Sequence, residues 1–199
     1  GRDLVGGIAC LYDSSPTIGN VTISESATGI IVREGCAPVI SNTVIARGSH
    51  HGVYAFDNGP TAAVLDHVTI VDSFDAGVYA YAASVEISSS SITHSGKAGV
   101  YAYECTPEIA YCNVYMNGQT SADPLYYDGA IGDQTGLSGN VSTEPYYCDY
   151  FGSAGYDYHV CFSSPNVGAG AGGTDIGAYG GACSACVSPV TPATWGAIK

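Results

Sequence analysis

The chain has 199 residues, of which 46% are hydrophobic, so it is long enough for one well-packed domain. Its 5 Lys and Arg against 18 Asp and Glu give a net charge of −13, which disfavours nucleic acid, anionic lipid and anionic polysaccharide as partners. No apolar run approaches the roughly 18 to 20 residues that span a bilayer, so we expect no membrane insertion. The 27 glycines and 16 tyrosines are typical of short strands joined by tight turns.

The first residues of the chain, "GRDLVGG", lack a charged region followed by an apolar stretch, so any secretion signal is expected to have been removed. The eight cysteines, an even number, favour an oxidising compartment. Together these features predict a protein that is secreted or lies at the cell surface.

Five glycine-led segments predict a repeat. The segment "GVYAY" at residues 77–81 recurs at 99–103, and "GVYAF" occupies 52–56. The related segments "GIACL" and "GIIVR" occupy 7–11 and 29–33. Successive glycines are 22 to 25 residues apart, which is the period of a solenoid.

A second segment follows each glycine-led one, and it alternates β-branched with polar residues, which predicts strands. Two apolar positions within this segment are five residues apart, so a straight strand cannot point both of them inward. The chain must therefore turn a corner between them, and Asn tolerates the left-handed conformation that such a corner can require. The expected corner residues are Asn20, Asn42, His67, Ser89 and Tyr111.

Side-chain parity predicts the interior of the solenoid, because residues two apart on a strand face the same side. We expect five stacked coils between residues 7 and 116 with four aliphatic columns inside. The columns are Ile8, Ile30, Val53, Val78 and Val100; Cys10, Val32, Ala55, Ala80 and Ala102; Ile18, Ile40, Leu65, Ile87 and Ile109; and Ile23, Ile45, Ile70, Ile92 and Val114.

The same parity points six aromatic side chains outward in two columns on one external face, with coils about 4.8 Å apart. These side chains could simply stabilise the parallel strands or support a covering loop. They could also form a contact surface for another protein or for neutral sugar rings. The columns are Tyr54, Tyr79 and Tyr101, and Phe56, Tyr81 and Tyr103.

The coil length, the aliphatic columns and the "PxIxN" corner resemble right-handed parallel β-helix proteins of the pectate-lyase-like superfamily, over residues 7 to 116. The stretches "GNVSTEPYY", "YDYHVCFSSPNVGAG" and "TDIGAYGGAC" resemble the closing segment of secreted bacterial β-helix proteins. The resemblance implies an all-β, right-handed parallel β-helix, with coils in residues 1–128 and a disulfide-containing, loop-rich C-terminal cap of the same domain in residues 129–186. It implies no single reaction, because the fold hosts lyases, hydrolases, esterases, adhesins and structural proteins.

Catalytic residues are few. A lyase needs basic residues to neutralise uronate and take a proton, and the five basic residues are scattered. Glycosidases of the family are similar in carrying three Asp residues on adjacent coils, but their "DD" motif is absent here. Two carboxylates about 5 to 10 Å apart would suffice for glycoside hydrolysis, although solvated corner and loop positions explain the acidic residues better. The candidates are Asp57, Asp66, Asp72 and Asp75, with His50, His51 and His67 beside them.

Four cysteines of the loop-rich C-terminal part, Cys148, Cys161, Cys183 and Cys186, are expected to form disulfides rather than a zinc site. We expect no cofactor. The exposed carboxylates could collect Ca²⁺, but no loop has a recognisable ligand spacing.

The other four cysteines lie within the predicted coils. Cys10 and Cys112 fall at inward positions, where a thiol behaves as a small apolar side chain. Cys36 and Cys105 occupy equivalent corners three coils apart, about 14 Å, which is too far for a disulfide.

Residues 187–199, "VSPVTPATWGAIK", predict an extended tail, because Pro189 and Pro192 disfavour a helix and keep the backbone extended. This tail holds the only tryptophan, Trp195, and is either a linker or an arm that reaches a neighbouring molecule. The first coil begins at residue 7, which leaves no room for a capping helix, so its edge is expected to be exposed.

These observations favour a non-catalytic, extracellular structural or adhesive subunit. We expect it to associate with its own copies, into filaments, through the first coil, the tyrosine face and the tail. The alternative is a carbohydrate-binding or carbohydrate-active β-helix protein, for which a cell-surface glycan would be the partner.

Overall fold

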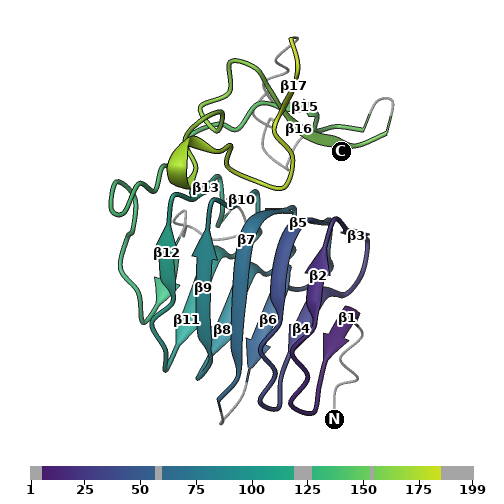
Figure 1. Ribbon diagram of the computed structural model, residues 1–199, viewed down its shortest axis with the longest axis vertical. Helices are drawn as coiled ribbons and strands as arrows, with labels where there is room; N and C mark the ends of the chain where they lie inside the picture. Colours follow the sequence, from purple (N-terminus) through teal and green to yellow (C-terminus); the bar gives the residue numbers. More distant parts are fainter. Residues whose placement is uncertain (1–5, 57–59, 119–126, 153–154, 185–199) are drawn as a thin grey trace, which may run out of the picture.

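The computed structural model describes residues 6–56, 60–118, 127–152 and 155–184. Within these residues the regular structure consists of short β-strands and one turn of 3-10 helix, η1 (Ala171–Gly173). The strands wind into a solenoid, and Figure 1 shows its coils side by side, from β1 (Gly6–Cys10) at one end to β12 (Glu108–Ala110) at the other. The prediction of an all-β parallel β-helix is confirmed.

Two parallel sheets enclose the core. Sheet A has the order β1-β4-β6-β8-β11-β14, and sheet B contains the second strand or pair of strands of each coil. The remaining strands of sheet A are β4 (Thr28–Val32), β6 (Val53–Phe56), β8 (Ala76–Tyr81), β11 (Ala98–Tyr103) and β14 (Tyr127–Gly129). The remaining strands of sheet B are β2 (Thr17–Gly19), β3 (Thr22–Ser24), β5 (Val39–Ala46), β7 (Ala62–Val71), β9 (Ser84–Ser88), β10 (Ser91–Thr93) and β13 (Asn113–Tyr115).

The strands pair in the register that the sequence predicts. Ile30 pairs with Val53, and Ile40 lies between Ile18 and Leu65. Every member of the four aliphatic columns is buried except Ile8, which is partly exposed. Because a buried aliphatic side chain stabilises the fold by about 1.5–3 kcal/mol, these columns are the main source of stability of the coils.

The repeat glycines are required by close packing between coils. A Cβ atom on Gly52 would contact the Ile70 side chain in sheet B and would lie 2.6 Å from the carbonyl oxygen of Gly77 in the next coil. Gly29 is in the same situation, between Ile45 and the carbonyl of Gly52. No side chain fits at such distances, which explains why the glycine recurs in each coil.

The predicted corners are present in sheet B. Asn20, Asn42, His67, Ser89 and Tyr111 all have left-handed backbone conformations, with φ between 46° and 57°. The corner therefore keeps its conformation whether or not the residue is asparagine, because the hydrogen bonds of the flanking parallel strands fix the backbone there.

The C-terminal residues form a small third sheet of β15 (Tyr147–Asp149), β16 (Asp157–Cys161) and β17 (Gly181–Cys183), which lies alongside the coils in Figure 1. Tyr147 and Tyr158 pack on Val44 and Val71 of sheet B. The hydroxyl of Tyr147 also lies 3.0 Å from the Ser91 hydroxyl. This segment therefore covers the outer surface of strands β5, β7 and β10.

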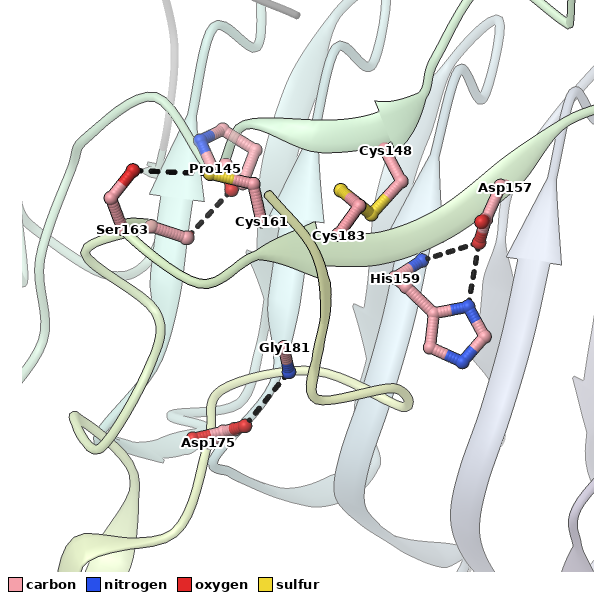
Figure 2. The surroundings of a disulfide bond; sticks show 10 residues. Pro145, Cys148, Asp157, His159, Cys161, Ser163, Asp175, Gly181 and Cys183 are labelled. Carbon is pink, nitrogen blue, oxygen red and sulfur yellow. Dashed lines mark hydrogen bonds and ion pairs between the residues drawn. A yellow bond between two sulfur atoms is a disulfide. The ribbon is translucent and has the colours of Figure 1, made fainter. Parts of the chain in front are cut away.

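A disulfide between Cys148 and Cys183 joins β15 to β17, as Figure 2 shows. Cys161 is also disulfide-bonded, and Cys186 lies outside the described residues. Cys10, Cys36, Cys105 and Cys112 are free, so Cys36 and Cys105 do not bond each other, as predicted. Cys10 and Cys112 are buried, in agreement with their inward positions.

Candidate functional site

Six aromatic side chains form the most extensive ring cluster on the outer surface of sheet A, and we call them the aromatic face. Within each column the rings of successive coils stack, with centroids 4.9 to 5.2 Å apart and interplanar angles of 10° to 28°. The columns are Tyr54, Tyr79 and Tyr101, and Phe56, Tyr81 and Tyr103.

This stacking decides which parts of the rings are accessible. The facing sides of neighbouring rings cover one another, so the middle rings Tyr79 and Tyr81 expose their edges. Among the described residues the end rings Tyr101 and Tyr103 each stack on one ring only, and Tyr103 is 46% exposed. A sugar that stacks on an aromatic ring needs a free ring face. Over most of its length the aromatic face therefore offers ring edges and phenol hydroxyls, and no other described ring covers the outer faces of Tyr101 and Tyr103.

Charged residues stand at the two ends of the columns. The guanidinium of Arg33 lies over the ring of Phe56, with its carbon 5.6 Å from the ring centroid. At the other end Asp128 of β14 pairs in register with Tyr101. The aromatic face is thus bounded by a cation at one end and a carboxylate at the other.

A hollow of about 340 Å³ lies beside the first column. Tyr79 and Tyr101 line it together with Ala76 and Ala98, whose small side chains leave the space open. This volume is within the range of small-ligand sites, which begins at about 300 Å³.

Two charged residues that line the hollow, Asp75 and Lys97, form an ion pair. Lys97 Nζ lies 2.5 Å from Asp75 Oδ1, and His50 Nδ1 lies 3.2 Å from Asp75 Oδ2. Burial alone would raise the pKa of Asp75, but hydrogen bonds from Lys97 and His50 lower it below its ordinary value. Asp75 is therefore ionised at neutral pH and is already engaged by two basic side chains.

His51 closes one end of the hollow. Its ring stacks on Tyr54 at 5.4 Å and approaches Tyr79 to 4.8 Å, and its Nδ1 accepts a hydrogen bond from the amide of Ala76. Burial lowers the pKa of His51. A neutral imidazole whose Nδ1 accepts a hydrogen bond carries its proton on Nε2.

The candidate catalytic carboxylates have separate partners. Asp66 accepts a hydrogen bond from Ser88 and pairs with His67 at the corner of sheet B. Asp72 accepts a 2.6 Å hydrogen bond from the hydroxyl of Tyr150 in the C-terminal segment. Asp75 belongs to the hollow, and Asp57 lies outside the described residues.

Asp72, Asp75 and His50 were candidates from the sequence, but two sets of contacts that they make, with Lys97 and with Tyr150, were not predicted. The contact of Asp75 with His50 and Lys97 could have been predicted from the sequence. Each of these residues stands two positions before a repeat glycine, and stacked coils place such residues next to each other. The second contact is the hydrogen bond from Tyr150 of the C-terminal segment to Asp72, for which the repeats contain no signal.

Other kinds of site are not formed in the described part of the chain. There, no three His, Cys, Asp or Glu side chains gather closely enough to hold a metal ion. No helix among the described residues has the length and apolar character to cross a membrane. Trp195, the remaining candidate binding residue, lies outside the described residues.

Comparison with known families agrees with this architecture. A family model described as a right-handed beta helix region matches residues 6–149, which is more than half of the chain, and the chain belongs to this family. The comparisons with curated proteins and with solved structures found no match. Membership fixes the fold and leaves the function to be argued from the surface.

Proposed function

We propose that the protein is a non-catalytic, extracellular structural or adhesive β-helix subunit that binds other copies of itself through the aromatic face. The observation that carries this proposal is the stacking of the six rings, which presents edges and hydroxyls over three consecutive coils. A rigid array of tyrosines offers a large contact area at a small entropic cost, which suits contacts between proteins.

The acidic residues support the absence of catalysis. Asp66, Asp72 and Asp75 each bind a different neighbouring group, and a glycoside hydrolase needs two carboxylates that flank one bond. The disulfide in the C-terminal segment supports an oxidising, extracellular location.

The first coil is a second contact region. In the described part of the chain β1 pairs with β4 and with no other strand, so its second edge can pair with another chain. If one copy places this edge or its aromatic face against a different surface of the next copy, the contact repeats without closure and generates a filament.

Sedimentation velocity over a range of protein concentrations tests the proposal. We expect concentration-dependent assembly, and we expect the double substitution Tyr81→Ser and Tyr103→Ser to weaken it about tenfold or more, as for aromatic interface anchors. Phe162→Ser is the matched control, because Phe162 is 63% exposed but belongs to the C-terminal segment. A chain that stays monomeric at the highest soluble concentration contradicts the proposal.

The hollow supports a second candidate, a carbohydrate-binding or carbohydrate-active protein. The Asp75, Lys97 and His51 side chains in its lining could exchange hydrogen bonds with the hydroxyls of a neutral sugar. Calorimetric titration with neutral oligosaccharides tests this candidate. Binding that is lost in Asp75→Asn while assembly persists would favour the carbohydrate role, and bond cleavage would establish an enzyme.

A further inference from the structure

Tyr81 of β8 and Tyr103 of β11 are the two tyrosines in the second column of the aromatic face. Their strands pair in register, and their rings stack with centroids 5.2 Å apart and an interplanar angle of 10°. Tyr103 is 46% exposed, and Tyr81 is partly exposed. Two phenol rings of one chain therefore lie against each other at the surface, where a reagent in solution can reach them.

Two neighbouring phenols can be joined by oxidation. Removal of one electron and one proton from a phenol gives a phenoxyl radical, whose unpaired electron is shared between the oxygen and the ring carbons ortho to it. Two such radicals couple by forming a bond between ortho carbons, and the hydrogens on these carbons then move to the oxygens and restore both hydroxyl groups. The pair loses two hydrogens in total, and hydrogen peroxide accepts them and becomes two molecules of water.

The pairing of the strands brings these two phenols within reach of each other. Adjacent parallel strands are about 4.8 Å apart, so the two side chains stay close while their rings rotate about the side-chain bonds. The ring on the other side of Tyr81 belongs to Phe56, with centroids 4.9 Å apart, and it has no hydroxyl group to oxidise. Within the second column, Tyr103 is therefore the phenol with which Tyr81 can couple.

A carboxylate stands next to the pair. Glu104 follows Tyr103 directly in the sequence, and its charge and hydrogen bonding raise the pKa of Tyr81. Oxidation of a phenol to its radical releases the hydroxyl proton, and a carboxylate within hydrogen-bond reach can accept that proton. Glu104 therefore favours the oxidation of Tyr81.

We propose that Tyr81 and Tyr103 form an oxidative cross-linking site, at which a haem peroxidase that uses hydrogen peroxide joins the two rings by a carbon–carbon bond within one chain. The site lies on the aromatic face but needs a single chain, so it does not depend on the proposed contact between copies. The bond connects two consecutive coils of sheet A. The four cysteines within the coils are free, so they supply no such covalent connection there.

Treatment of the dilute full chain with a haem peroxidase and hydrogen peroxide tests the proposal. The product should have the mass of one chain less two hydrogens, and the link should survive a thiol reductant, unlike a disulfide between free cysteines. Lys97 stands between the two tyrosines, so trypsin separates their peptides unless a cross-link joins them. Fragmentation of the joined peptides should locate the bond at Tyr81 and Tyr103. A bond at other tyrosines, or bonds between copies alone, overturns the proposal.

A conservative variant identifies the reacting ring. Tyr81→Phe keeps a stacked ring and removes the hydroxyl group, so the protein should fold normally and the joined peptides should disappear. Tyr156→Phe is the matched control, because Tyr156 and Tyr158 also stack at an interplanar angle of 10° but with centroids 6.2 Å apart. The control should give the same yield of joined peptides as the unaltered chain. Equal yields from Tyr81→Phe and the control overturn the assignment to Tyr81.

A rescue variant tests whether stacking of phenols is the requirement. Tyr103→Phe should abolish the cross-link, and adding Phe56→Tyr gives Tyr81 a phenol on its other side, where the ring centroids are 4.9 Å apart. The cross-link should return, now between position 56 and Tyr81, as a loss of two hydrogens from the single tryptic peptide that contains both. No return of the cross-link in this double variant, while the unaltered chain reacts, overturns stacking as its basis.

Discussion

At the scale of single residues, Gly52 illustrates how the coils restrict the sequence. The glycine faces both the Ile70 side chain and the carbonyl of Gly77. We expect Gly52→Ala to lower the free energy of unfolding by about 1–3 kcal/mol, because the added methyl group forces neighbouring coils apart. Chemical denaturation measures the change.

Gly48 provides the control for this prediction. A Cβ atom there would lie 3.4 Å from the nearest atom, the carbonyl oxygen of Ser26, which a small shift accommodates. We expect Gly48→Ala to change the free energy of unfolding by less than about 0.5 kcal/mol. Equal effects of the two substitutions would show that close packing does not explain the repeat glycine.

His94 predicts a loss of stability in acid. Its ring lies 4.7 Å from that of Tyr150, and burial lowers the pKa of His94 to about 4. The native state therefore favours the neutral imidazole of His94. The contribution of this preference to the free energy of unfolding is complete above the ordinary pKa of 6.5 and is lost as the pH falls from 6.5 to about 4. This loss amounts to about 3 kcal/mol. His94→Asn, which retains tolerance for the left-handed backbone at this position, should flatten the pH dependence measured by denaturation.

Asp72 has the opposite effect on stability in acid, and it therefore tests the sign of the predicted pH dependence. Burial raises the pKa of Asp72, although the hydrogen bond from Tyr150 acts against this shift. A raised folded-state pKa means that the native state gains relative stability as the pH falls through it. Asp72→Asn should therefore steepen the acid loss that His94→Asn flattens, and the same slope in both variants would contradict these assignments.

At the scale of the strand, neighbouring residues of β5 differ sharply in burial, because successive side chains point to opposite sides of the sheet. Ile40 is fully buried, whereas its neighbour Val39 is 44% exposed. We expect Ile40→Asp to prevent folding, because an unpaired carboxylate in the dry interior is strongly penalised. Val39→Asp should fold normally, and circular dichroism with solubility measurements distinguishes the two. Soluble, folded Ile40→Asp protein would falsify the assignment of the columns.

The elements also show why part of the structure could be predicted. Ile18, Ile40 and Leu65 occupy the same position in successive coils. Because the alternation of apolar and polar residues is repeated in each coil, the sequence identifies the side chains that face the interior. The charged pair of Asp75 and Lys97 was readable by the same rule, but only after the coils were aligned at the residues before the glycine.

The C-terminal segment follows no repeat, and its position was not predictable. Tyr147 reaches Ser91 and Thr93, more than fifty residues earlier in the chain, through single hydroxyl contacts. Pairs of polar residues at such separations occur throughout any sequence of this composition. Only the folded chain selects among them, because burial of Tyr147 demands partners for its hydroxyl.

At the scale of the whole molecule, the net charge predicts how assembly responds to salt. Two copies of charge −13 repel each other, and the repulsion is screened as the Debye length shortens from about 10 Å at 0.1 M salt to about 3 Å at 1 M. We expect assembly, measured by light scattering, to strengthen with ionic strength. Weaker assembly at high salt would mean that local ion pairs, such as one with Lys199, outweigh the overall repulsion.

The in-register pairing of β8 with β11 also makes the molecule modular in length. Ala76 pairs with Ala98 and Tyr81 with Tyr103, so residues 76–97 form one complete coil whose two neighbours present the same pattern to it. Duplicating or removing such a coil leaves the neighbouring strands of sheet A with equivalent partners, whereas the contacts of Tyr147 with Ser91 and Thr93 join this coil to the C-terminal segment. The gene could therefore lengthen or shorten the rows of rings by one step at a time, and binding strength would change in increments while the fold stays the same.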